Sequence, residues 1–108
     1  VNETGNALEE ANADLKTAQD NYDAAANRQT VASDAYTKAE AELNAAKDAE
    51  RKAKAAFDKA EEDYFNEPNE WNDAAQQQAK DAWDTASATV TKAQQAFDEA
   101  NTALNGAQ

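Results

Sequence analysis

An unbroken seven-residue repeat constrains the fold of this chain more than any other feature of its sequence. One set of positions holds mostly large side chains, and a second set, three residues further on, holds alanine every time. The first set is Leu8, Leu15, Tyr22, Gln29, Tyr36, Leu43, Glu50, Phe57 and Tyr64. The second set is Ala11, Ala18, Ala25, Ala32, Ala39, Ala46, Ala53 and Ala60. A repeat sustained over this length predicts a left-handed coiled coil in which both sets face a partner helix.

The repeat resumes after Pro68, the only proline of the chain. Its large residues are then Trp83, Val90, Phe97 and Leu104, and its alanines are Ala79, Ala86, Ala93, Ala100 and Ala107. If the chain folds back at Pro68, residues equally distant from it face each other, and large side chains meet alanine in seven layers. Such pairing lets two helices approach closely. The sequence therefore predicts an all-α fold, a long antiparallel two-helix coiled-coil hairpin.

Local signals predict where the helices begin and end. Asn6 with Glu9 three residues later is a variant of the capping box and marks the start of the first helix. The first helix should end near Asn66, before the proline, and Gly106 is a stop signal for the second. We expect one domain over residues 1–108, with its first arm at about 6–66, its tip at 66–69 and its second arm at about 69–106.

The beginning of the chain leaves an open question, because the second arm covers the first only back to about Thr30. The large residues of the repeat before that point then lack a partner inside the hairpin. A longer parent protein, a second molecule, or a fold-back of residues 1–30 could supply one. The fold-back corresponds to an alternative fold, a three-helix bundle with a break near residues 30–33. Oligomerisation through residues 8–29 is the alternative that involves a second molecule.

Charge and composition exclude several classes of function. A formal net charge of -12 argues against a nucleic-acid partner, because such proteins carry basic patches, and it suits a basic or neutral protein partner. The chain has no cysteine and no histidine, so the usual zinc sites are excluded. No apolar run exceeds three residues, and we expect no membrane insertion and no signal peptide. Carboxylates on a rod lack the partly dry cleft that acid–base catalysis needs, so we expect no catalytic residue, metal site, cofactor or enzyme activity.

The stretch DYFNEPNEWN, residues 63–72, collects large and charged side chains around the proline. A turn requires asparagine and proline but not additional aromatic residues. Phe65 and Trp71 are equally distant from Pro68, so one interpretation is a hydrophobic clasp that closes the hairpin, with Asn66 or Asn69 capping the second arm. The other interpretation is an exposed aromatic binding site at the end of a rod. The two are compatible, and the sequence leaves both open.

Several stretches of the sequence resemble the receptor-binding hairpin of the E-group colicins. They are ANADL (11–15), NRQ (27–29), Ala35-Tyr36, AEAELNAA (39–46) and KAQQAFDEA (92–100), together with the spacing to the tip proline and a tryptophan soon after it. Colicins of this group, and related nuclease bacteriocins such as cloacins and klebicins, carry a long antiparallel coiled coil. The tip of that coiled coil docks on an outer-membrane transporter of the target cell.

The resemblance implies the receptor-binding domain of a secreted bacteriocin that acts extracellularly, at the surface of a Gram-negative target cell. Its partner would be an outer-membrane protein of the TonB-dependent transporter type. This tip is shorter than the colicin tip and lacks its basic and glycine residues, so the vitamin B12 receptor is only one candidate. The resemblance places receptor binding at Tyr64, Phe65, Asn66, Glu67, Pro68, Asn69, Glu70 and Trp71. The rival hypothesis is an alanine-rich coiled-coil stalk of a bacterial surface protein or adhesin.

Overall fold

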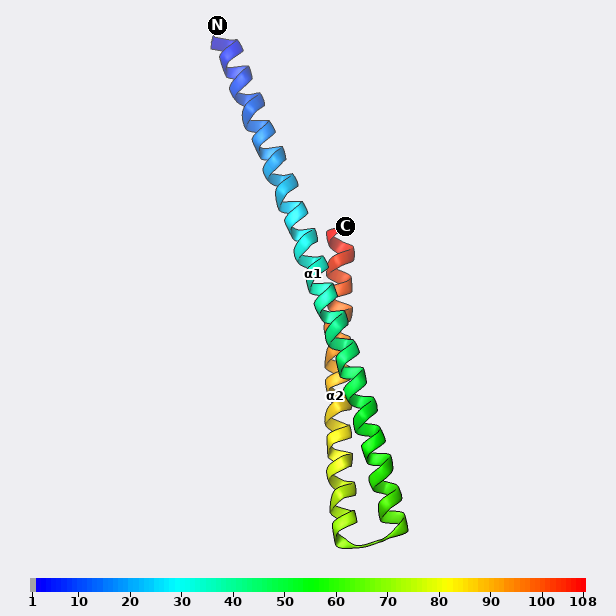
Figure 1. Ribbon diagram of the computed structural model, residues 1–108. Helices are drawn as coiled ribbons and strands as arrows, with labels where there is room; N and C mark the ends of the chain where they lie inside the picture. Colours follow the sequence, from blue (N-terminus) through cyan, green and yellow to red (C-terminus); the bar gives the residue numbers. More distant parts are fainter. Residues whose placement is uncertain (1) are drawn as a thin grey trace.

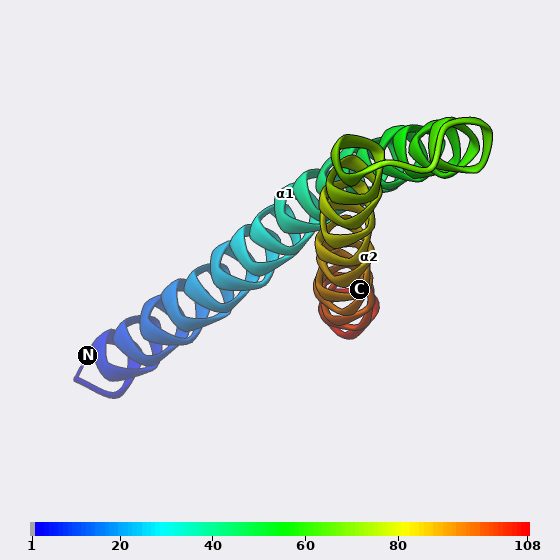
Figure 2. The same ribbon diagram turned by 90° about the horizontal axis from the view of Figure 1, so that it is seen from below.

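The computed structural model describes residues 2–108 as two long helices joined by a short turn (Figure 1). Helix α1 spans Asn2–Asn66 and helix α2 spans Glu70–Ala107. The helices run antiparallel in a rod 98 Å long and 14 Å wide. In Figure 1, α1 passes in front of α2 from upper left to lower right, which is the sense of a left-handed supercoil, and the view from below in Figure 2 shows the two helices crossing at an angle. The predicted two-helix hairpin is confirmed.

The core of the hairpin is a single seam at alternating spacings of four and three residues. In α1, the buried and half-buried residues are Ala32, Tyr36, Ala39, Leu43, Ala46, Glu50, Ala53, Phe57, Ala60 and Tyr64. All of them belong to the two sets that the heptad pattern predicts. Four are buried, and three of these four are alanines. Because alanine leaves room for the opposite backbone, the two helices pack closely along a narrow line and enclose no wider interior.

Two ring contacts confirm the predicted register. The ring centroids of Tyr36 and Phe97 are 5.0 Å apart, and those of Phe57 and Trp83 are 5.4 Å apart. In a hairpin folded about Pro68, each of these four residues faces an alanine of the other helix. The contacts join large residues of neighbouring layers, as expected when large and small side chains interdigitate.

Helix α1 continues through residues 30–33 without a break. The hydroxyl of Thr30 donates to the backbone carbonyl of Ala26 at 3.1 Å, and that of Thr37 donates to the carbonyl of Ser33 at 3.1 Å. Bonds to the carbonyl four residues earlier require helical backbone on both sides of the supposed break. The alternative three-helix bundle is therefore wrong, and residues 2–30 do not fold back on the hairpin.

The start of α1 differs from the prediction. The helix begins at Asn2, and Asn6 and Glu9 lie inside it, so their capping box does not mark the helix start. Adding a residue to an existing helix gains a hydrogen bond and avoids the cost of nucleation, so a good capping residue alone does not end a helix. Glu3 in the first turn also suits the positive end of the helix dipole.

The other helix ends lie close to their predicted places. Helix α1 ends at Asn66, as predicted. Helix α2 ends at Ala107, one residue after Gly106, and the backbone N–H of Gln108 donates to the carbonyl of Leu104 at 3.2 Å. Gly106 itself keeps a negative φ and does not form a left-handed cap.

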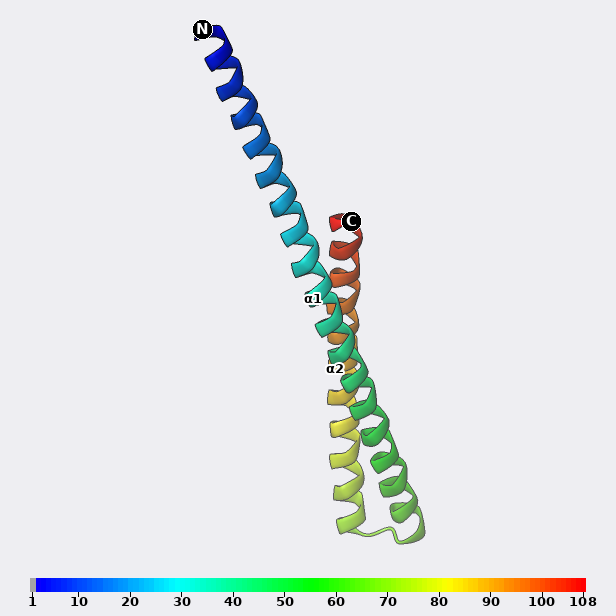
Figure 3. The ribbon, with the colours of Figure 1, turned by 45° about the horizontal axis from the view of Figure 1, so that its top comes forward.

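The first part of α1 projects beyond the end of α2 (Figures 1 and 3). We call residues 2–26 the free arm. Its large seam residues Leu8, Leu15 and Tyr22 are 62%, 66% and 73% exposed, whereas Leu43 on the same seam is 5% exposed. The heptad pattern therefore continues along the free arm without a partner inside the described chain.

Candidate functional site

Residues 67–69 reverse the chain at the tip of the rod. Asn69 is the N-cap of α2, with extended backbone angles, φ -145° and ψ 172°. Its side-chain oxygen accepts a hydrogen bond from the backbone N–H of Asn72 at 2.8 Å, and its carbonyl accepts one from Asp73 at 2.9 Å. Of the two capping residues that the sequence offered, Asn69 caps the second arm, because Asn66 is still part of α1.

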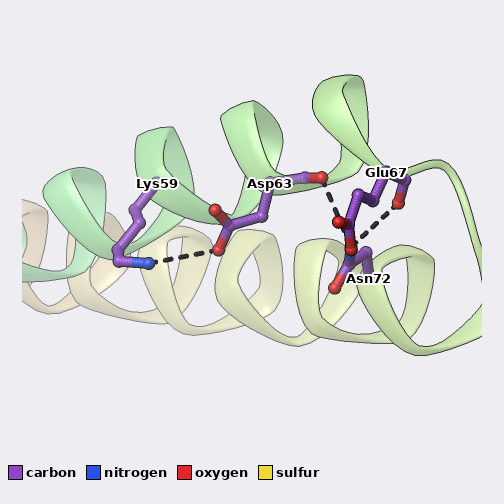
Figure 4. A network of polar contacts seen from close by, with 4 residues as sticks. All are labelled: Lys59, Asp63, Glu67 and Asn72. Carbon is purple, nitrogen blue, oxygen red and sulfur yellow. Dashed lines mark hydrogen bonds and ion pairs between the residues drawn. The ribbon is translucent and has the colours of Figure 1, made fainter.

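The side chain of Asn72 closes the turn from the opposite side (Figure 4). Its Nδ2 donates to the backbone carbonyl of Glu67 at 2.8 Å and to that of Asp63 at 3.3 Å. The last carbonyls of a helix lack partners within the helix. The carbonyl of Asp63 already accepts from the backbone N–H of Glu67 at 2.9 Å, so Asn72 adds a second donor there and supplies a donor to the carbonyl of Glu67. In the heptad pattern Asn72 faces Tyr64 and breaks the rule that large meets alanine. The structure explains this exception, since the position serves the end of α1 instead of the apolar seam.

The tip aromatics do not form a clasp. Phe65 and Trp71 are each 84% exposed, more than the leucines of the free arm. A clasp would bury both rings against each other, so the clasp interpretation is wrong. Phe65 follows the seam residue Tyr64, and Trp71 precedes the seam residue Asn72, so both rings leave the helices to the side of the seam. The hairpin is closed without them, and both rings are free to contact another molecule.

The tip is also strongly acidic. Its carboxylates come from Glu61, Glu62, Asp63, Glu67, Glu70 and Asp73. The last turn of α1 contains no basic residue, although cations would suit the negative end of its dipole. Asp63 is held by Lys59, whose Nζ lies 3.2 Å from the carboxylate (Figure 4). Helix stability alone does not account for three acids at the end of α1, so their placement points to another requirement.

The structure places the eight predicted tip residues in different settings. Asn66, the last residue of α1, and Pro68, in the turn, are exposed. Tyr64 is half-buried in the seam, and Asn69 is engaged in capping. Phe65, Glu67, Glu70 and Trp71 are exposed, and we call these four residues the tip surface. The sequence did not lead us to predict that Asn72 binds the end of α1. The signal that could have identified this role is a polar residue at a seam position beside a turn.

The tip surface exposes two aromatic rings and two carboxylates. Among the described residues, no three acidic, cysteine or histidine side chains are arranged so that they could hold a metal ion. Neither helix, over residues 2–108, has a stretch that is apolar and long enough to cross a membrane. Comparison of the chain with family models, curated proteins and solved structures finds no match.

Proposed function

We propose that this chain is the receptor-binding hairpin of a bacteriocin, whose tip docks on an outer-membrane protein of a Gram-negative target cell. The observation that carries the proposal is the 84% exposure of Phe65 and Trp71 beside a turn that closes without them. Exposed aromatic rings add nothing to the hairpin seam, whereas aromatic side chains are common anchors of protein interfaces. The resemblance of the arms to the colicin hairpin suggests the class of parent protein and partner.

In this proposal the coiled coil acts as a stiff spacer and the tip as a probe. Close packing along the seam keeps the rod extended, so the tip surface is held far from the rest of a parent protein. The carboxylates of Glu67 and Glu70 would direct the tip toward a basic loop of the receptor, because opposite charges accelerate encounter. The rings of Phe65 and Trp71 would then supply the buried contact area.

A stalk of a bacterial surface protein is the second candidate, and the free arm is the observation that favours it. Its seam continues in the phase of the hairpin, as in a rod that extends by pairing along its length. A stalk needs the rod and makes no use of the tip surface. The two candidates therefore differ in what happens when the tip aromatics are removed.

The decisive experiment measures binding of the hairpin to outer-membrane proteins captured from candidate Gram-negative cells, with the vitamin B12 receptor among them. We expect Phe65→Ala combined with Trp71→Ala to weaken binding by roughly 2 kcal/mol or more. The matched control is Leu8→Ala combined with Leu15→Ala, which removes exposed apolar side chains at the far end of the rod. A receptor that binds the tip variant as well as the wild type would leave recognition to the arms and favour the stalk.

A second measurement tests the charges of the tip. Glu67→Lys combined with Glu70→Lys should slow association and reduce its salt dependence, with less effect on dissociation. Glu9→Lys combined with Glu10→Lys makes the same change in charge on the free arm and serves as the control. Equal effects of the two variants would mean that only the net charge matters and that the tip does not steer the encounter.

A further inference from the structure

Basic residues are concentrated in one stretch of α1. Five of the ten lysine and arginine residues of the chain lie within residues 47–59, together with three of its 22 acidic residues. The stretch is therefore net positive, although the formal net charge of the chain is -12. Such segregation creates a local positive potential on a rod that is otherwise acidic.

Three of these basic residues lie together beside the seam. Lys47, Arg51 and Lys54 are spaced by four and three residues, so they share one face of α1. The Nζ of Lys54 lies 6.0 Å from the ring centroid of Trp83, and Lys47 and Arg51 line a hollow beside Val90. Because Trp83 and Val90 are seam residues of α2, this face of α1 borders the second helix.

Lys80 adds a cation from α2 to the same side of the hairpin. It follows a seam alanine, as Lys47 and Lys54 do in α1. In an antiparallel pair, the residues that follow the alanine positions of the two helices lie on one flank. Lys80 and Lys54 are also nearly equally distant from Pro68, so they lie at nearly the same level of the rod. All four cations are exposed, and we call Lys47, Arg51, Lys54 and Lys80 the basic flank.

Ion pairs within the chain do not account for the basic flank. Arg51 pairs with Asp48, and Lys54 pairs with an acid one turn further along, at 3.5 Å. Exposed pairs of this kind add little to stability. Within residues 2–108, Lys47 and Lys80 form no ion pair, and none of the four cations pairs with Glu50, the half-buried acid that lines the same hollow. The four cations are therefore accessible to another molecule.

We infer that the basic flank binds a short acidic segment of the protein that the tip surface contacts, so that the interface continues down the rod. This inference rests on the proposed function. Phe65 lies eleven residues after Lys54 and eighteen after Lys47, which correspond to three and five helical turns, so all three share one face of α1. At a rise of about 1.5 Å per residue, the flank lies about 16–27 Å from the tip ring. The partner then presents a basic loop to the tip and an acidic segment further along.

Acidic residues at both ends limit the size of the occupant. On the same face of α1, Glu40 lies two turns before Lys47, and Glu61 lies two turns after Lys54. The cations between them extend over about 10 Å, a length that about three extended residues cover. A nucleic acid or an anionic membrane continues beyond this length and would come within the roughly 8–10 Å over which those carboxylates repel it. A short acidic loop of a protein fits between them.

A short acidic peptide tests the surface without a receptor. Hexaglutamate is added to the ¹⁵N-labelled hairpin at physiological salt, and the indole N–H signals of its two tryptophans are followed by NMR. We expect the signal of Trp83, whose ring lies near Lys54, to shift and that of the exposed Trp71 to stay. Lys47→Gln combined with Lys54→Gln should abolish the shift and keep the helical content.

Two outcomes of this titration would overturn the inference. One is a Trp83 signal that does not move up to millimolar peptide, or that moves equally in the glutamine variant. The other is binding to phosphatidylglycerol vesicles that the glutamine variant abolishes, which would assign the flank to a membrane instead of an acidic protein segment.

Association kinetics then test the flank on the receptor itself. Lys47→Glu combined with Lys54→Glu changes the net charge by two units per residue, from -12 to -16. A receptor that responds only to the acidic tip and the net charge would bind this variant faster. A receptor with an acidic segment opposite the flank should bind it about tenfold more slowly. Lys38→Glu combined with Lys52→Glu makes the same change on residues that precede seam alanines, on the other side of α1, and should not slow association.

The inference and the proposed function fail in different ways. If the tip variant loses binding while the glutamate variant of the flank associates as fast as the wild type or faster, the proposed function stands and the inference is overturned. If no outer-membrane protein binds the wild type, the proposed function fails, and the assignment of the acidic segment to such a receptor fails with it. Should the charge reversal lower the helical content, Lys47→Gln combined with Lys54→Gln keeps the apolar stems and repeats the measurement with the same expected direction.

Discussion

The side-chain amide of Asn72 lies 2.8 Å from the backbone carbonyl oxygen of Glu67 and joins the first turn of α2 to the end of α1. The backbone N–H of Asn72 is bound at the same time by the side chain of Asn69. One residue therefore completes hydrogen bonds at two helix ends. The chain reversal is closed by polar bonds to the backbone and not by an apolar cluster.

This arrangement predicts a specific loss of stability. Asn72→Ala should lower the free energy of unfolding by about 1–2 kcal/mol, because the carbonyls of Glu67 and Asp63 lose a donor. Asn72→Asp should cost more, since a carboxylate cannot donate to a carbonyl and repels it. Urea titration followed by circular dichroism measures the change. Asn44→Ala on the exposed side of α1 is the control and should be neutral or slightly stabilising. Equal stability of the two alanine variants would contradict the proposed role of Asn72.

The two tryptophans should differ sharply when each is replaced by alanine. Trp83 is half-buried and packs on Phe57, and Lys54 Nζ lies 6.0 Å from its ring centroid. Trp83→Ala should therefore cost about 2–4 kcal/mol. Trp71→Ala should change stability by less than about 0.5 kcal/mol, because that ring is exposed. Thermal unfolding of the two variants gives the comparison, and a large loss from Trp71→Ala would mean that the tip ring supports the fold.

Close approach of the helices predicts that the seam rejects a larger residue. Ala39 is 7% exposed and faces Phe97, so Ala39→Leu should destabilise by about 1–3 kcal/mol through overpacking. Lys38 precedes Ala39 in the chain, and its side chain is 79% exposed, so Lys38→Leu should have little effect on stability. Chemical denaturation of both variants measures the difference. The assigned register would be wrong if both substitutions had the same effect.

The register also predicts a covalent link between the two helices. A cysteine pair at Ala46 and Val90 should form a disulfide within one chain, because the two residues occupy the same layer of the seam. The product should run as a monomer in non-reducing electrophoresis and unfold at a higher temperature than its reduced form. Asp48 with Val90 is a control pair, since Asp48 points outward. If the cysteine pair at Ala46 and Val90 gave dimeric products and no cross-linked monomer, the intramolecular hairpin would be disproved.

The seam was predictable because its chemistry repeats. Each layer pairs a large residue with an alanine, so many positions independently indicate the same register. The pairing of residues equally distant from Pro68 follows from that register. Leu43 and Ala46 are buried as the pattern requires. A single exception such as Glu50 does not disturb the register, since the half-buried position lets its carboxylate reach water.

The contacts of the tip were harder to predict because no repeat links its residues, and each makes contacts of its own. Equal distance from Pro68 places Phe65 and Trp71 at the same level of the rod, but not on the same side. Each lies one residue from the seam, and one residue turns a helix by about 100°, so neither ring lies in the contact line. The prediction that α1 starts at Asn6 was wrong for another reason. The capping signal of Asn6 is local, and extension of an existing helix is more favourable than ending it there.

Closure of the turn by two asparagines has an evolutionary consequence. Asn69 and Asn72 bind backbone atoms, which every sequence provides, so the reversal does not depend on the identity of the neighbouring exposed side chains. Positions 65, 67, 70 and 71 can therefore mutate with little effect on folding. A lineage that keeps the two asparagines and the alanine seam can explore new tip chemistries one substitution at a time, without passing through unfolded intermediates.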